Sequence, residues 1–486
     1  MYLIILILVI FFILISYKFF SDRNNIHKLK RISMVWSIII FFVFTILLII
    51  FSELSYLQYS ISLNWFDNYS SNILWGKIPF SLDGLSVFLI GLSIILVPIC
   101  LLISWEVVEK FNKEFILCIF IILFVLIGVF STLDILLFYI LFEATLVPMF
   151  LLIGVWGSRE EKVKAAFYFF FYTLVGSLLM LISIFKIYSI TGSTNYEGIS
   201  SIEIPSYLQF WFFIGFSLSL GVKIPMIPVH IWLPQAHVEA PLAGSVLLAG
   251  ILLKLGGYGF LRFIFPLFPL ASEYFSPFLI LLSLVAIIYG GLTTCRQSDM
   301  KRLIAYSSVA HMGLVTLSVF THCVEGLFAC IVMMLAHGLI SSGLFMSSGF
   351  LYARHHSRVI KYFKGLTVTM PLLSSVTLFL ILSNISFPLT FNFIGEFFSI
   401  LAAFKYSWIV GLVSSLGALV ATVYALYFYN RIYFGSLSSY LIKSKEIAYF
   451  EFYSFIPLII LTLFLGVYPN YLFKFILLSS LLNISL

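Results

Sequence analysis

Residues 221–241 read GVKIPMIPVHIWLPQAHVEAP and place a lysine, Lys223, beside a group of prolines. An apolar run, YLQFWFFIGFSLSL, precedes this stretch, and a second one, LAGSVLLAGILLK, follows it. A charged side chain at the centre of a membrane-spanning helix costs roughly 2.5–3.5 kcal/mol, and proline interrupts helical hydrogen bonding. The stretch therefore predicts a membrane helix that is broken beside a buried charge.

The composition predicts a polytopic helical membrane protein. Of the 486 residues, 62% are hydrophobic and only 10% are charged. Each spanning helix needs about 20 apolar residues, so a chain of this kind holds many spans. The N-terminal run MYLIILILVIFFILISYKFF has no basic region before it and no small-residue cleavage site after it, which favours an uncleaved first helix. The five cysteines show no CxxC spacing, which argues against a disulfide framework, a zinc site or an iron–sulfur cluster within the chain.

Apolar runs separated by polar breaks indicate about fourteen spanning helices in an all-α fold, centred near residues 10, 43, 93, 122, 145, 176, 218, 252, 285, 312, 336, 385, 420 and 465. Of the 27 Lys and Arg residues, 20 fall in the odd-numbered loops between these helices. Basic loops mark one side of a membrane, so both termini are expected on the opposite side. The net charge of +7 thus reflects membrane topology and does not indicate nucleic-acid binding.

A second proline break is predicted in the twelfth span, where Pro388 lies between Asn384 and Asn392. Interrupted helices in corresponding positions of two halves are the sequence signature of an ion site in transporters. Because the breaks fall in spans seven and twelve, we expect two inverted five-helix repeats, spans 4–8 and 9–13. The chain is then one integral membrane domain with N-terminal helices 1–3, a first half-channel, a second half-channel and a C-terminal helix 14, at residues 1–105, 106–265, 266–436 and 437–486.

Three ionisable residues, Glu143, Lys223 and Lys254, are predicted to lie within spans of the first half. Glu143 has seven apolar residues before it, and Lys254 is near the centre of its span. A glutamate can instead reach a membrane interface, and a buried lysine can simply pair with a carboxylate. Ionisable residues at membrane depth are nevertheless rare and usually functional, so two lysines together with two buried glutamates favour a proton relay.

The second half contributes His311 and His337, on neighbouring predicted helices, and Glu396 in the broken twelfth span. Histidine titrates near neutral pH and is therefore suited to passing protons. Two alternatives remain open for the histidines: ordinary hydrogen-bonded contacts, or ligation of a haem by a histidine pair on two helices.

Other polar residues favour structural roles. Asp83 and Asp134 are interpreted as helix N-caps at the surface. The run ARHHSR at residues 353–358 is interpreted as an interfacial basic loop. Three residues at or beyond the end of the broken seventh helix either line a water route or belong to a solvated loop: His230, His237 and Glu239.

Several motifs resemble those of the antiporter-like membrane subunits of respiratory complex I, which are related to subunits of Mrp-type cation/proton antiporters. These motifs are FEATLVPMFLLIGVWGS, LGVKIPMIPVHIWLPQAHVEAP, LAGILLKLGGYGF, YSSVAHMG, LAHGLISSGLF and FIGEF. The resemblance covers roughly residues 80–435. Among the paralogues of the family, the chain is most similar to the type with a glutamate, here Glu396, where the others usually carry a lysine. A long C-terminal lateral helix, found in another paralogue, is not seen in the sequence.

The resemblance implies a role for each of the six buried residues. Glu143 is expected to pair with Lys223 in the first half-channel, and Lys254 to pass protons along the central axis. His311 and His337 would continue the path, and Glu396 would close the second half. Histidine at position 311, where some relatives have lysine, leaves the resting charge there open.

The resemblance also implies partners and a location. The chain would be a proton-translocating subunit of an NADH:ubiquinone oxidoreductase, in contact with other membrane subunits, including neighbouring antiporter-like ones, and with lipids. No nucleotide, flavin, quinone or metal motif is present, so NADH, FMN, iron–sulfur clusters and ubiquinone are expected on partner subunits. The Phe-, Ile- and Tyr-rich composition favours the mitochondrial inner membrane, with basic loops toward the matrix and both termini toward the intermembrane space. A bacterial plasma membrane, and a cation/proton antiporter subunit, remain alternatives.

Overall fold

The computed structural model of the chain describes residues 2–18, 26–51, 57–64, 77–108, 110–438, 440 and 445–476. Two of the basic loop residues, Arg23 and Lys443, lie outside these ranges, as does the end of the expected C-terminal helix.

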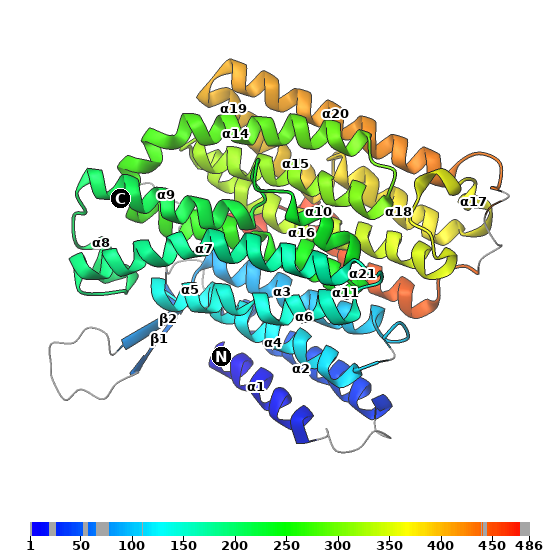
Figure 1. Cartoon of the computed structure of the whole chain (residues 1–486), viewed down its shortest axis with the longest axis horizontal. Coiled ribbons are helices and arrows are strands. Elements are labelled where there is room, and N and C mark those ends of the chain that lie inside the picture. The colour runs from blue at the N-terminus through cyan, green and yellow to red at the C-terminus, as the bar shows by residue number, and fades with distance from the viewer. Residues whose placement is uncertain are drawn as a thin grey trace.

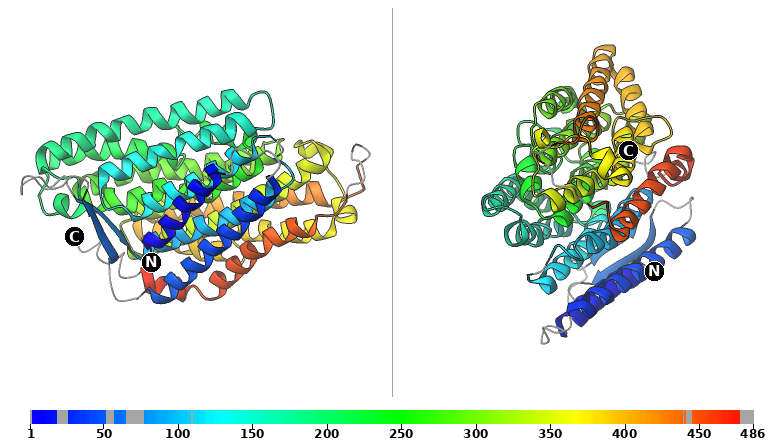
Figure 2. Two further views of the ribbon diagram at one scale, coloured as in Figure 1. Left: turned by 90° about the horizontal axis from the view of Figure 1, so that it is seen from below. Right: turned by 90° about the vertical axis from the view of Figure 1, so that its right-hand side faces the viewer.

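Long helices lie side by side and form one elongated bundle (Figure 1), which is seen close to end-on in the right-hand view of Figure 2. The N-terminal helices form one edge of the bundle. They are α1 (Tyr2–Lys18), α2 (Ile26–Ile50), α3 (Gly84–Ile103) and α4 (Asn112–Ser131). Of these, α3 and α4 are mostly buried, because they pack between α2 and the rest of the bundle.

The central part of the chain contains the most irregular helices. Its elements are α5 (Ile135–Ala144), α6 (Leu146–Trp156), α7 (Lys162–Thr191), α8 (Tyr196–Ser200), α9 (Ser206–Lys223), α10 (Trp232–Glu239), α11 (Leu242–Leu247), η4 (Leu248–Leu252), α12 (Lys254–Gly259), η5 (Phe260–Ile264) and α13 (Phe265–Leu267). Both η4 and η5 are π-helical, so α12 is a short α-helical piece between two widened turns.

The rest of the chain returns to long helices. Its elements are α14 (Pro269–Cys295), α15 (Met300–Phe320), α16 (Val324–His355), η6 (Ile360–Tyr362), α17 (Leu366–Thr369), α18 (Pro371–Asn384), α19 (Phe391–Tyr406), α20 (Trp408–Tyr433) and α21 (Tyr449–Val467). The α15 and α16 helices are almost entirely buried, whereas α20 lies along the opposite edge of the bundle from α1 (Figure 1).

Eleven helices within the described residues are long and apolar enough to cross a membrane. The prediction of a polytopic helical membrane protein is therefore confirmed. The predicted break in the seventh span separates α9 from α10, and the break in the twelfth separates α18 from α19. In both places the helix ends before a proline, Pro225 or Pro388, which supplies no backbone donor.

A two-stranded sheet was not predicted. Strands β1 (Gln58–Asn64) and β2 (Lys77–Leu82) pair antiparallel and lie at one end of the bundle (Figure 1). The sequence QYSISLN alternates polar and apolar residues, which is the pattern of a half-buried strand. A count of apolar runs that are long enough to span a membrane does not detect a strand of this length.

Asp83 is the N-cap of α3, as expected, but it is buried rather than at the surface. Its carboxylate accepts a hydrogen bond from Ser86 N and lies 2.9 Å from Nη1 of Arg262 in η5. This buried ion pair joins the N-terminal helices to the π-helical segment, and a buried pair of this kind is stable only while both partners are present. Asp134 likewise caps α5, and burial raises the pKa of its carboxyl group, against the hydrogen bonds donated by Thr194 and Leu137.

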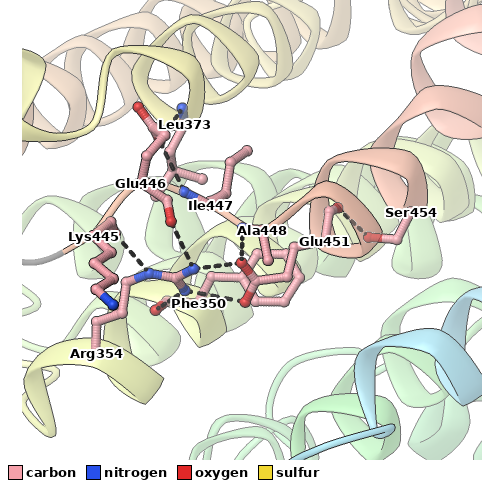
Figure 3. Close-up of polar contacts among 9 residues, drawn as sticks. All are labelled: Phe350, Arg354, Leu373, Lys445, Glu446, Ile447, Ala448, Glu451 and Ser454. Atoms are coloured by element: carbon pink, nitrogen blue, oxygen red, sulfur yellow. Dashed lines mark hydrogen bonds and ion pairs between the residues drawn. The ribbon is translucent and has the colours of Figure 1, made fainter.

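A polar clamp joins three helix ends (Figure 3). Arg354, near the end of α16, binds both carboxylate oxygens of Glu451 in α21, and its Nε donates to the carbonyl of Lys445 at 3.1 Å. Glu446 accepts from the backbone N–H groups of Leu372 and Leu373 at the start of α18. The clamp thus holds α16, α18 and α21 together where the first turns of α18 and α21 would otherwise leave backbone donors unsatisfied and the last turn of α16 would leave carbonyl acceptors unsatisfied.

Replacing Arg354 with methionine is expected to destabilise this end of the bundle by about 2 kcal/mol, because a paired, mostly buried carboxylate loses a bidentate partner. The measurement is the thermal stability of the assembled complex and the amount of this subunit in it. The control is Lys405→Met, which breaks the more exposed ion pair with Glu325 and should change stability little. Equal effects of the two substitutions would contradict a special role for the clamp.

Candidate functional site

The breaks in the helices position Glu143 and Lys223. Glu143 is half-buried and is the next-to-last residue of α5, two residues before Thr145, which separates α5 from α6. Lys223 is the last residue of α9, and it is buried where the proline break begins. A lysine at the C-terminal end of a helix is favourably placed next to the unpaired carbonyl groups there.

The two residues are not in direct ion-pair contact, although their charges interact. The Nζ of Lys223 lies 4.2 Å from the ring centre of Phe142, a cation–π arrangement, and has no hydrogen-bond partner among the described residues. Glu143 lies near Ser177 of α7, but its buried Oε1 has no hydrogen-bond partner among the described residues. Glu143 and Lys223 are therefore neighbours whose charges interact without a direct ion pair among the described residues.

Lys254 lies in the most buried part of the bundle, at the start of α12 and directly after η4. Its Nζ donates to the carbonyl of Ala249 in η4 and lies 3.0 Å from Nδ1 of His337 in α16. Single π-helical turns are rare and occur often at functional sites. The lysine is thus held by one backbone carbonyl and one titratable ring.

A glycine allows this approach of α16 to η4. A Cβ atom at Gly338, the neighbour of His337, would lie 2.8 Å from the carbonyl oxygen of Gly250 and 2.7 Å from a side-chain methyl of Leu92. Any larger residue would push the helices apart. The close approach brings His337 within reach of Lys254.

His337 and His311 continue the chain of contacts toward Glu396. The rings of His311 and His337 have centres 5.7 Å apart. His311 Nδ1 lies 3.1 Å from Oε1 of Glu396, close enough for an ion pair but not aligned as a hydrogen bond. Gly395 permits this geometry, because a Cβ there would lie 3.1 Å from the backbone of Met333 in α16.

The structure therefore brings four of the six expected residues into one contact chain, in the order Lys254, His337, His311, Glu396. Glu143 and Lys223 form a separate pair, and no described hydrogen bond or ion pair joins Lys223 to Lys254. The two groups are linked by the packing of α9 against α12.

The contact between Lys223 and the ring of Phe142 was not predicted from the sequence. Asn392 was noted only as a sign of a broken helix, yet its Nδ2 lies 3.3 Å from Oε1 of Glu396. Its position four residues before Glu396 was an available signal, since such residues share one face of a helix.

The C-terminal end of α10 is not the solvated loop that was one of the two alternatives for this segment. His237 and Glu239 are buried, and the ring of His237 is stacked on Phe345 at 4.5 Å. Arg358 was expected in an interfacial loop but is buried, and it binds the carbonyl of Val238. Burial lowers the pKa of Arg358. The nearby carboxylates of Asp299 and Glu239 act in the opposite direction and raise it. Loops of the second half fold over α10, which sequence periodicity cannot indicate.

Lys301, another expected loop residue, is also buried and donates to the carbonyl of Ala240 at 3.1 Å. Next to Glu239 lies an open pocket that includes Glu161, Lys164, Gln235 and Arg302. This pocket connects the surface with the buried end of α10, so the water-route interpretation has support at this position.

Comparison with known proteins identifies a family. A family described as NADH:quinone oxidoreductase/Mrp antiporter, transmembrane, matches residues 132–422. The chain is 54% identical to NADH-ubiquinone oxidoreductase chain 4 of Metridium senile, with 92% of this chain and 91% of that protein covered. It is 45% identical to the chain 4 protein of Arabidopsis thaliana, with 93% and 90% covered.

The fold is shared with solved membrane complexes. A chain of respiratory complex I from Thermus thermophilus with bound NADH superimposes with a TM-score of 0.89 at 25% identity, and 99% of both chains is covered. A chain of the Mrp complex from Dietzia sp. has the same fold, with a TM-score of 0.84 at 18% identity, covering 99% of this chain and 96% of that one.

The resemblance inferred from the motifs is confirmed, including the paralogue type with a glutamate in the twelfth span. The family model matches more than half of the chain and supports this assignment. The chain 4 relatives support it too, and the match to them covers almost their whole length. The chain belongs to the NADH:quinone oxidoreductase/Mrp antiporter membrane family and, within it, to the chain 4 proteins of NADH-ubiquinone oxidoreductase.

Proposed function

We propose that the chain is a proton-translocating membrane subunit of NADH:ubiquinone oxidoreductase and that six ionisable residues, five of them buried and Glu143 half-buried, carry the protons. The observation that supports this most directly is the contact chain from Lys254 through His337 and His311 to Glu396. Each member can take up and release a proton, and each is buried where a fixed charge is costly. A purely structural network would not require titratable groups at every step.

Glu143 and Lys223 act as a switch in the first half. A buried lysine holds its proton weakly in apolar surroundings and tightly beside a carboxylate. A change of about 3 pH units in proton affinity corresponds to roughly 4 kcal/mol. Moving one charge against about 200 mV requires roughly 4.6 kcal/mol. Closing and opening the contact between Glu143 and Lys223 can therefore supply most of the free energy that is needed to move one proton across the membrane.

Lys223 has room for such a change, because its ammonium group contacts the Phe142 ring and no hydrogen-bond acceptor among the described residues. The proline break after Lys223 leaves backbone carbonyls without helical partners, and these can hold water at membrane depth. Water is also the route that would join Lys223 to Lys254.

The finer topology is part of the same proposal: fourteen spans, inverted repeats of spans 4–8 and 9–13, and the divisions 1–105, 106–265, 266–436 and 437–486. Each of the fourteen expected centres has a helix or a helix break at its position. Three of them, near residues 10, 218 and 385, involve helices that are short or broken, which accounts for the difference from eleven. The paired breaks, α9–α10 and α18–α19, support the repeats.

The partners are other membrane subunits of the complex, including neighbouring antiporter-like subunits, and lipids. NADH, FMN, iron–sulfur clusters and ubiquinone are bound by partner subunits in this proposal, and the chain contributes proton transfer alone. The membrane is the mitochondrial inner membrane, with basic loops toward the matrix and both termini toward the intermembrane space. The named relatives in plants and an anemone support the mitochondrial location.

Two other functions have weaker support. A cation/proton antiporter subunit has the same fold, but the Mrp chain is far less similar in sequence than the chain 4 proteins. For a haem carrier, the support is limited to two neighbouring histidines, His311 and His337, whose ring centres lie 5.7 Å apart. A Soret band of the purified protein would be the sign of haem.

The proposal is tested by His337→Asn, which interrupts the contact chain at its centre. We expect proton pumping and quinone turnover to fall by about tenfold, because general acid–base groups typically contribute at least this much. Transfer of electrons from NADH to an artificial acceptor should not change. The control is His356→Asn, which changes an exposed histidine at the end of the same helix. Wild-type pumping by an assembled His337→Asn complex would overturn the relay.

A further inference from the structure

Asn392 occupies a place next to Glu396 that the relay described above does not use. It is buried in the first turn of α19, on the same face as Glu396, which follows four residues later. Its side-chain Nδ2 lies 3.3 Å from Glu396 Oε1 and 2.9 Å from Ser386 Oγ. Ser386 belongs to the break between α18 and α19, so one amide group joins the carboxylate to the broken backbone.

Two side chains lie next to the same carboxylate oxygen, and one of them, Asn392, donates a hydrogen bond to it. His311 Nδ1 lies 3.1 Å from Oε1 of Glu396, and Asn392 Nδ2 approaches the same atom. An imidazole nitrogen donates only while it carries a proton, whereas an amide NH₂ group always donates. When His311 gives up that proton, Asn392 remains as the donor that holds the carboxylate.

The other titratable group that faces Glu396 comes from α20. Tyr424 is buried, lies near Asn384 at the end of α18 and interacts electrostatically with Glu396, but its hydroxyl has no hydrogen-bond partner among the described residues. On α16, Gly395 packs against Met333, and His337 reaches Glu396 only through His311. The surroundings of Glu396 thus comprise one imidazole ring, one phenol and one amide that always donates.

We propose that Asn392 is a positioning residue for the second half of the relay: its amide holds the Glu396 carboxylate beside His311, ties it to Ser386 in the helix break, and thereby sets the pH at which Glu396 releases its proton. This inference rests on the proposed relay function of Glu396. A hydrogen bond donated to a carboxylate favours the ionised form, so Asn392 eases the release step.

The test compares two substitutions at one position. Asn392→Leu keeps the volume but removes the donor, and Asn392→Asp keeps the shape but places a second carboxyl group beside Glu396. In both variants Glu396 should hold its proton more strongly, because it loses a donor or gains a like charge. We expect the acid limb of the pH profile of quinone turnover to move upward by about one pH unit.

The control is Ser383→Ala, which removes another buried hydroxyl at the same break. Ser383 Oγ donates to the carbonyl of Phe379 at 2.8 Å, and no hydrogen bond among the described residues joins it to Glu396. The pH profile of quinone turnover of Ser383→Ala should coincide with that of the wild type. The assays use membranes with the assembled complex, and the amount of complex is measured by electron transfer from NADH to an artificial acceptor.

The outcomes separate this inference from the proposed function. Wild-type pumping by Glu396→Gln overturns the relay at Glu396 and this inference with it. Loss of pumping in Glu396→Gln, together with an unshifted profile in both Asn392 variants, overturns the inference alone. A uniform loss of turnover at every pH in Asn392→Asp likewise contradicts it, because a merely structural role would have that effect. An upward shift in the Asn392 variants and none in Ser383→Ala supports it.

Discussion

Glu143→Ala is expected to lower proton pumping and coupled quinone turnover by about tenfold or more. Glu143 interacts electrostatically with Lys223, whose buried ammonium group otherwise contacts only the Phe142 ring among the described residues. Without the carboxylate, the lysine loses the partner that can restore its hold on a proton, and a buried charge left alone is strongly disfavoured. The first half would then be trapped with a neutral lysine.

The measurement is simultaneous pumping and NADH:quinone turnover in membranes that contain the assembled complex. Glu160→Ala is the matched control, because Glu160 is an exposed glutamate in the turn after α6. If Glu143→Ala pumps normally, the carboxylate is structural, and the switch proposed for the first half is wrong. A loss of pumping with normal turnover would mean that the pair couples the two processes but does not limit electron transfer.

The largest effect is expected for Lys254→Met, about a hundredfold loss of pumping and coupled turnover. Methionine matches the length of lysine but carries no proton, and a proton-transfer group typically contributes at least this factor. Lys254 is the only contact of His337 toward the first half among the described hydrogen bonds and ion pairs. The substitution therefore separates the two halves at a single point.

Two further variants show whether Lys254 acts through its proton or its charge. Lys254→Arg keeps the positive charge, but arginine does not release its proton in proteins, so pumping should also be lost. Full activity of Lys254→Arg would show that charge alone is sufficient and would contradict a transfer role. Lys186→Met, at an exposed position of α7, is the control and should behave as the wild type.

The site consists of residues that sequence reasoning could find and of a geometry that it could not. Glu143, Lys223, Lys254 and Glu396 stand out because a charge within an apolar run is costly and therefore needs an explanation. Their contacts do not follow from that argument. Sequence reasoning expected a pair of Glu143 with Lys223, whereas the structure places Lys223 on Phe142 with Glu143 nearby.

The burial of two basic residues is a second feature that could not be predicted from the sequence. Lys301 and Arg358 were expected among exposed basic residues, because positive loops usually face water. In the structure both are buried and bind the carbonyls of Ala240 and Val238 at the end of α10. These contacts join parts of the chain that lie 61 and 120 residues apart. Local composition carries no information about such distant partners.

The sequence by itself determined the helical membrane class, the two breaks and the family, because apolar run length, proline and motif residues are local properties. The tertiary structure alone decided the order Lys254, His337, His311, Glu396, the burial of the Asp83–Arg262 pair and the position of Asn392 on Glu396. These depend on how closely helices approach, and that distance is set by side chains such as Gly338 and Gly395 on opposing helices. Packing between segments far apart in the chain thus arranges the charges that the local sequence supplies.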